Sequence, residues 1–219
     1  MTACELFFDA IRRGDTRHVR LLLQQDAGLA ASRDATGVSA LLFACYNRRR
    51  EMIELLADTL PALDLFEATA VGRLDRVTAL LAEDASRARA FTPDGFTALH
   101  YAAFFGQPEL AAALLAAGAD PDAQARNAMQ VRPLHSAVAA GQRAVVALLL
   151  RQGADPNTRQ QGGWTPMQGA AHLGDAEMVR TLLAHGADRA VANDEGKTAL
   201  EIARADGHLH LLDLLRLDG

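Results

Sequence analysis

Seven histidines are the side chains of this sequence best suited to acid–base or metal chemistry. They stand at His18, His100, His135, His172, His185, His208 and His210. His208 and His210 are two residues apart on a predicted helix, and side chains share a helix face only at spacings of three or four. The pair should therefore point in different directions, and we expect no metal site.

Other signatures of catalysis are missing from the sequence. It contains no nucleophile elbow, no phosphate-cradling glycine loop and no Cys-x-x-Cys pair. The acidic pairs Glu83-Asp84 and Asp194-Glu195 are more simply helix-end and turn residues than a general acid and base. We therefore expect no catalytic residue, no cofactor and no enzymatic activity.

The segment that the rest of the chain copies is FTALHYAAFFGQPELAAALLAAGAD, residues 96–120. It has the pattern of two short helices on either side of Gly106, because glycine adopts a left-handed backbone most easily. Looser and closer copies have their inter-helix positions at residues 14, 48, 72, 106, 141, 174 and 207, with spacings of 34, 24, 34, 35, 33 and 33. A unit of this size cannot bury its own apolar face. The pattern therefore predicts an array in which each unit packs on its neighbours.

A period near 33 residues together with a Thr-Pro-Leu-His-x-Ala pattern is typical of ankyrin repeats. The chain therefore resembles the ankyrin repeat family, most specifically in its fourth to sixth units. The resemblance implies an all-α ankyrin repeat solenoid of helix-turn-helix units with short β-hairpin fingers, as a single domain over residues 1–219. The seven units span approximately 5–37, 38–62, 63–95, 96–130, 131–163, 164–196 and 197–219. It also implies that His100 and His135 form structural hydrogen bonds between adjacent repeats.

Two departures from the regular period predict local irregularities. The spacing of 24 between the second and third units leaves out about the number of residues that form a finger, so we expect one finger to be absent there. The spacing of 35 places Gln130 where a turn glycine is expected, so the tip at 128–130 should be irregular. The tails of the first and third units, DAGLAASRDATG and DASRARAFTPDG, resemble each other.

Composition limits the classes of partner and location. A net charge of -5 argues against nucleic acid, and Arg48 to Arg50 fit a solvated turn better than a basic patch. No apolar run is long enough to span a bilayer, and no secretory leader is evident. Two lone cysteines, Cys4 and Cys45, favour a reducing compartment, so we expect a cytoplasmic protein. Arginine outnumbers lysine 21 to 1, which hints at a bacterial source.

The resemblance further implies that variable residues on the fingers and inner helices select a protein partner. By register these candidate partner-binding residues are Tyr46, Asn47, Asp94, Phe96, Phe104, Phe105, Met129, Val131, Gln161, Trp164, His172, Leu173, Asp194 and Lys197. This surface is basic at the first unit, apolar in the middle and mostly acidic at the last. We expect it to take an apolar segment that is acidic toward the first unit and basic toward the seventh.

The aromatic residues of that surface could serve in two ways that involve no heterologous partner. They could pack on one another between fingers, or a second copy of the chain could cover them. The sequence thus predicts a non-catalytic adaptor, expected as a monomer, that binds protein but neither nucleic acid nor membrane. The alternatives are a homodimer and a structural, self-associating repeat array without a dedicated partner.

Overall fold

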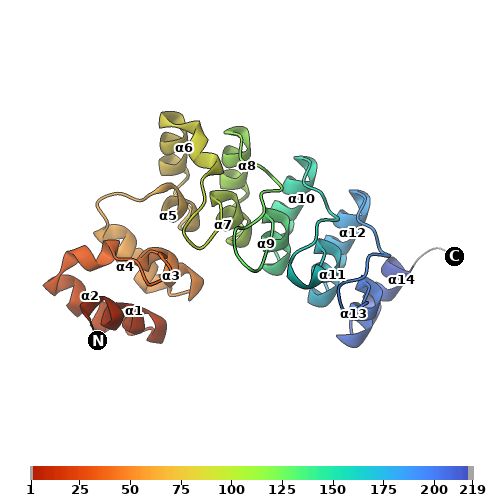
Figure 1. The fold of residues 1–219 in the computed structure, drawn as a ribbon, viewed down its shortest axis with the longest axis horizontal. Coiled ribbons are helices and arrows are strands. Elements are labelled where there is room, and N and C mark those ends of the chain that lie inside the picture. The colour runs from red at the N-terminus through yellow and green to blue at the C-terminus, as the bar shows by residue number, and fades with distance from the viewer. Residues whose placement is uncertain (1, 217–219) are drawn as a thin grey trace.

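The computed structural model describes residues 2–216, in which α-helices occur in pairs joined by tight turns. The pairs lie side by side from one end of an elongated molecule to the other (Figure 1). The α-helices are α1 Ala3–Arg13, α2 Thr16–Gln25, α3 Ala40–Tyr46, α4 Arg50–Thr59, α5 Leu65–Ala70, α6 Leu74–Glu83, α7 Ala98–Phe104, α8 Pro108–Ala116, α9 Pro133–Ala139, α10 Arg143–Arg151, α11 Pro166–Leu173, α12 Ala176–Ala184, α13 Ala199–Ala205 and α14 Leu212–Leu215. The 3-10 helices are η1 Ala27–Ala31, η2 Ala85–Arg89, η3 Gln161–Gly163 and η4 Leu209–Leu211.

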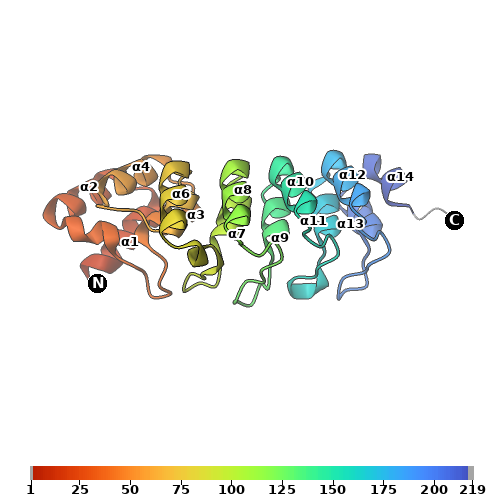
Figure 2. The same ribbon diagram turned by 90° about the horizontal axis from the view of Figure 1, so that it is seen from above.

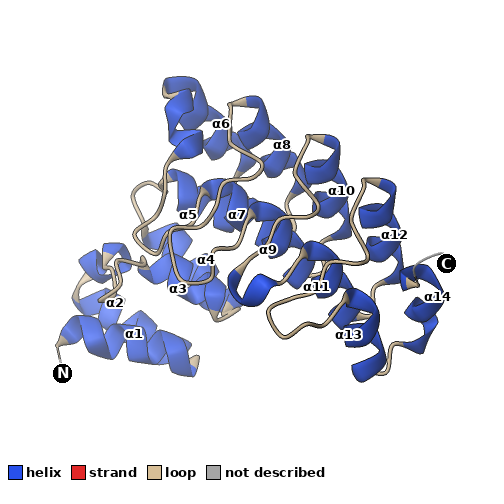
Figure 3. Ribbon diagram, turned by 45° about the vertical axis from the view of Figure 1, so that its right-hand side comes forward, coloured by secondary structure: helices blue, strands red, loops and turns tan. Residues whose placement is uncertain are grey.

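The helices form two layers. Odd-numbered helices pack on odd-numbered neighbours from α1 to α13, and even-numbered helices form the second layer. Except between α4 and α5, the loops that lead from each second helix to the next pair project to one side of the molecule (Figures 2 and 3). An all-α repeat solenoid is therefore confirmed, and the last three residues of the predicted seventh unit lie outside the described residues.

Local sequence signals account for where the helices begin and turn. Thr165 accepts a hydrogen bond from the backbone N–H of Gln168, and Pro166 is the first residue of α11. Gly106, at the turn between α7 and α8, has a φ of 71°. Arg48 takes the same place in the second pair with a φ of 53°, a conformation that a residue with a Cβ seldom adopts.

Small side chains let the inner layer pack closely. Ala98, Ala102 and Ala103 of α7 and Ala137 of α9 are fully buried. Together with larger residues they belong to one continuous core from Leu65 to Leu215, whereas the first two helix pairs bury a separate core. A third, smaller cluster containing Tyr101 joins these two parts of the molecule.

The junction between the two parts coincides with the expected missing finger, which is confirmed. Only residues 60–64 separate α4 from α5. The fingers on either side consequently touch, because a Cβ added to Gly37 would come within 2.7 Å of the Pro93 Cβ. The similar tails of the first and third units also have the same structure, since each forms a 3-10 helix, η1 or η2, followed by one isolated β-bridge.

The fingers differ from the β-hairpins that were expected. Within residues 2–216 the only β-bridges are the isolated pairs Arg33 with Ser39 and Phe91 with Thr97. The other fingers are tight turns that form no strand ladder. Each closes with a backbone hydrogen bond across its own turn, as where the Gln160 N–H donates to the Trp164 carbonyl over 2.9 Å. Each also bonds to the preceding finger, as where the Arg126 N–H donates to the Gly95 carbonyl over 2.9 Å. The predicted irregular tip is confirmed at Gln130, whose φ is 52°.

Candidate partner-binding groove

A cavity of about 470 Å³ lies between the fingers and the inner helices α7 and α9. We call it the aromatic groove. Its lining residues are Tyr46, Asp94, Phe96, His100, Tyr101, Phe104, Met129, Val131, His135, Ser136, Ala139 and Gln160. Tyr46 and Met129 are among the few large apolar or aromatic side chains with substantial exposure, at 38% and 46%. The groove therefore presents an accessible surface built mainly from aromatic and aliphatic groups.

Differences between neighbouring repeats create the groove. The fourth unit carries Tyr101 and Phe104 at positions where the fifth unit has Ser136 and Ala139. The large rings stand beside small side chains, so the space above α9 is not filled. Proteins pack their interiors densely, so an open apolar space of this size makes this part of the surface a candidate binding site.

Tyr101 is the centre of the aromatic cluster under the groove. It is 3% exposed, and its ring lies within 6.1 to 6.4 Å of the rings of Tyr46, Phe66, Phe96 and Phe105. Sequence reasoning missed Tyr101 because helical periodicity directs it toward the core. The signal available in the sequence was its size. The residue after the motif histidine is Tyr101 in the fourth unit but Ser136 in the fifth, and in the sixth unit, where the histidine is replaced, it is Gly169.

Tyr46 connects the second helix pair to the fourth across the missing finger. Its hydroxyl donates to Asp94 Oδ2 over 2.7 Å and lies 2.8 Å from the Tyr101 hydroxyl. Burial is the largest cause that raises the pKa of both tyrosines, so both hydroxyls keep their protons at neutral pH. This network fixes one wall of the groove.

His100 and His135 form the inter-repeat hydrogen bonds that were predicted. His100 Nε2 lies 3.2 Å from the Val131 carbonyl, and His135 Nε2 lies 3.3 Å from the Trp164 carbonyl. Each Nδ1 accepts a backbone N–H, so each Nε2 carries the proton and donates. Burial lowers the pKa of each histidine to about 4, which leaves both neutral beneath the groove at neutral pH.

The structure places some of the candidate residues at the aromatic groove and others away from it. Six of them line the aromatic groove: Tyr46, Asp94, Phe96, Phe104, Met129 and Val131. Phe105 does not, because its ring stacks on Tyr101 at an interplanar angle of 10° and packs against the third cluster. Ring packing of the kind that the self-packing alternative expects involves Phe105, and also Phe96 and Tyr46, whose rings contact Tyr101 as well. Asn47 does not line the groove either, and its side chain donates to the Phe43 carbonyl over 2.7 Å.

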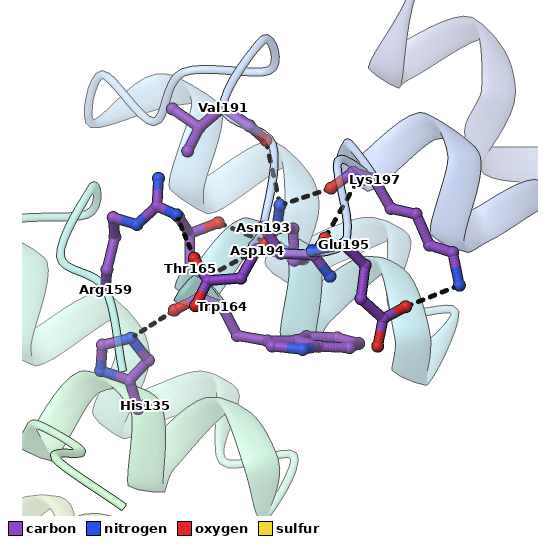
Figure 4. Close-up of polar contacts among 10 residues, drawn as sticks. His135, Arg159, Trp164, Thr165, Val191, Asn193, Asp194, Glu195 and Lys197 are labelled. Atoms are coloured by element: carbon purple, nitrogen blue, oxygen red, sulfur yellow. Dashed lines mark hydrogen bonds and ion pairs between the residues drawn. The ribbon is translucent and has the colours of Figure 1, made fainter. Parts of the chain in front are cut away.

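A second set of candidates lies near the C-terminal fingers, outside the aromatic groove. It comprises Gln161, Trp164, His172, Leu173, Asp194 and Lys197. The Trp164 ring is half-buried against the core and lies 6.0 Å from the His172 ring. Figure 4 shows this ring beside the finger that carries Asp194 and Lys197.

The expected order of charges along the surface is present but largely neutralised within the chain. At the first unit Asp9 pairs with Arg13 over 2.8 Å. At the other end Arg159 pairs with Asp194 over 3.0 Å, and Lys197 pairs with Glu195 over 2.8 Å (Figure 4). Charged ends of a partner would therefore gain less than the sequence alone suggests.

In the part of the chain that the structure describes, no three histidine, cysteine, aspartate or glutamate side chains gather as metal ligands, and no helix is long and apolar enough to span a membrane. His208 and His210 lie at the 3-10 helix η4, and their rings are 6.0 Å apart. Each instead bonds a carbonyl of the preceding unit, that of His172 or that of Gly174, over 3.0 Å.

These features define a helical repeat solenoid in which turns and inner helices line an open apolar groove. A family model described as "Ankyrin repeats (3 copies)" matches residues 134–219, and one described as "Ankyrin repeat" matches residues 94–126. The chain belongs to the ankyrin repeat family. Ankyrin repeats are in general protein-interaction modules, and the family is typically non-enzymatic.

Curated relatives share only part of their length with this chain. Ankyrin repeat and SOCS box protein 3 of Bos taurus is 40% identical over 151 residues, which make up 68% of this chain and 28% of that protein. The human NAD-capped RNA hydrolase NUDT12 is 41% identical over 59 residues, or 27% of this chain and 13% of the hydrolase. The likeness therefore concerns a fraction of each relative.

Proposed function

We propose that this chain is a non-catalytic adaptor that binds a segment of a partner protein in the aromatic groove. The observation that carries the proposal is the open space of about 470 Å³ over Ser136 and Ala139, walled by Phe104 and floored by a buried aromatic cluster. A contiguous apolar surface of this kind is a common mark of a protein interface. Each apolar side chain that a partner buried there would contribute roughly 1.5 to 3 kcal/mol.

The remaining features of the proposal follow from the same arrangement. Seven helix pairs make one array, so we assign residues 1–219 to a single domain with the unit boundaries given above. The free thiols of Cys4 and Cys45 fit a reducing compartment, and we propose a cytoplasmic location. The acidic net charge favours a protein partner over nucleic acid or an anionic membrane.

The test fills the groove without disturbing the core. Ala139 is exposed at the end of α9, and Ala205 is exposed at the equivalent end of α13, away from the groove. Peptides should first be selected on the wild-type chain from a displayed library of random 12-residue peptides. Ala139→Phe should weaken their binding by at least about tenfold, as expected for the loss of one buried apolar side chain. Ala205→Phe should leave it unchanged.

The outcomes are read by fluorescence anisotropy, with circular dichroism as the check on folding. Equal binding by wild type and Ala139→Phe would reject the aromatic groove as the binding surface. Light scattering over a concentration series tests the alternative of a self-associating array. A mass that rises with concentration, and that Ala139→Phe lowers, would assign the groove to a second copy of this chain.

A further inference from the structure

Asp94 is the one lining residue of the aromatic groove that carries a formal charge at neutral pH. It is half-buried, and among residues 2–216 it has no cationic partner. Its carboxylate accepts from the Tyr46 hydroxyl over 2.7 Å and from the Tyr101 hydroxyl over 3.4 Å. A carboxylate offers about four acceptor sites, so capacity for further donors remains.

This unpaired charge contrasts with the carboxylates of the finger at 193–197. Glu195 stands at the equivalent position of the finger between the sixth and seventh units and pairs with Lys197 over 2.8 Å. Asp194 pairs with Arg159. The groove therefore combines an uncompensated negative charge with aromatic rings, and both attract a cation.

We infer that the aromatic groove recognises an arginine of the partner segment, with an apolar side chain close to it in the sequence. The inference rests on the proposed function and names the chemistry of its partner. The guanidinium would pair with the Asp94 carboxylate beside the exposed ring of Tyr46. The apolar side chain would occupy the space over Ser136 and Ala139, next to Phe104.

Arginine fits this site better than lysine. Its guanidinium is planar and weakly hydrated, stacks on aromatic rings and can donate two hydrogen bonds to one carboxylate, whereas an ammonium is a compact, strongly hydrated charge. The chain itself contains such a contact on a neighbouring finger, where the Arg126 guanidinium carbon lies 3.8 Å from the centre of the Phe91 ring.

The experiment uses the full chain and the same displayed library of random 12-residue peptides. Selected sequences should be enriched in arginine with an apolar residue within a few positions. Three synthetic versions of the most enriched peptide are then compared: one with arginine, one with lysine and one with citrulline, which keeps the shape and removes the charge. Asp94→Asn keeps an acceptor for Tyr46 and should weaken the arginine peptide about tenfold, in the range expected for a charge-assisted pair.

Matched controls separate this charge from its surroundings. Glu195→Gln removes a carboxylate at the same finger position and should leave binding of the arginine peptide unchanged. The citrulline peptide should bind wild type and Asp94→Asn equally, because the charge pair is then already broken. The lysine peptide should bind wild type more weakly than the arginine peptide.

Three results would overturn the inference, and they differ in what they leave standing. Enriched peptides without arginine, or arginine peptides that bind Asp94→Asn as well as wild type, would reject arginine recognition. If, in either case, the enriched peptides bound Ala139→Phe more weakly than wild type, the proposed function would stand. If the enriched peptides bound Ala139→Phe as tightly as wild type, or if no peptide were enriched, both the inference and the proposed function would fall.

Discussion

Acidification from about pH 7 to about pH 4 should destabilise the folded chain by roughly 3 kcal/mol for each of two buried histidines. His100 and His135 are 2% and 4% exposed, and burial lowers the pKa of each from 6.5 to about 4. Below pH 6.5 these histidines bind protons in the unfolded chain but stay neutral in the folded chain. Their contribution to the free energy of unfolding is therefore fully present above pH 6.5 and is lost as the pH falls toward 4.

Urea unfolding at several pH values measures this loss, and the chain supplies its own control. Gln168 occupies the histidine position in the sixth unit, and its amide donates to the Lys197 carbonyl over 2.9 Å. His100→Gln with His135→Gln should therefore keep the inter-repeat bonds and flatten the pH dependence between 6.5 and 4. Glu67 has the opposite effect on stability. Burial raises its pKa, so acidification favours the folded chain at this residue. An unchanged slope in the double variant would contradict the assignment to these histidines.

Gly95→Ala should cost on the order of 2 to 4 kcal/mol of stability, a large effect for a change on a turn. Gly95 has a φ of 89°, and an added Cβ would lie 2.8 Å from the backbone carbon of Arg126. The methyl group would thus suffer backbone strain and would also push two hydrogen-bonded fingers apart. Chemical denaturation of wild type and variant gives the difference directly.

Gly196→Ala is the matched control for the contact between fingers. Gly196 occupies the equivalent position with a φ of 76°, but an added Cβ there meets no atom within 4 Å. It should show only the cost of a left-handed backbone, about 1 kcal/mol. Equal losses in the two variants would mean that the contact between the fingers of the third and fourth units contributes nothing to stability.

The fold could be predicted because every repeat carries the same local sequence signals. The glycine at the inter-helix turn and the apolar spacing on each helix required no long-range information, and even the missing finger followed from one short spacing. Finger pairing could not be predicted in the same way. The turn at 92–95 bonds within itself, but its further bond to Arg126 depends on how closely two repeats approach.

The candidate site was predictable only in part. Phe104 and Met129 were found by register, but the sequence could not show that Phe105 turns onto Tyr101 while Phe104 stays at the groove. Tyr46 reaches Asp94 because a finger is absent between them, a consequence of three-dimensional stacking. Likewise, the sequence could not show that ion pairs within the chain largely neutralise the charge at each end of the surface.

The most direct test of the central claim is hydrogen–deuterium exchange of the full chain with and without the most enriched peptide. If a polypeptide docks in the aromatic groove, protection should rise in 94–104 and 129–139, the segments that carry most of its walls. Protection confined to the second set of candidates around Trp164, or to the even-numbered helices, would show that the partner binds elsewhere.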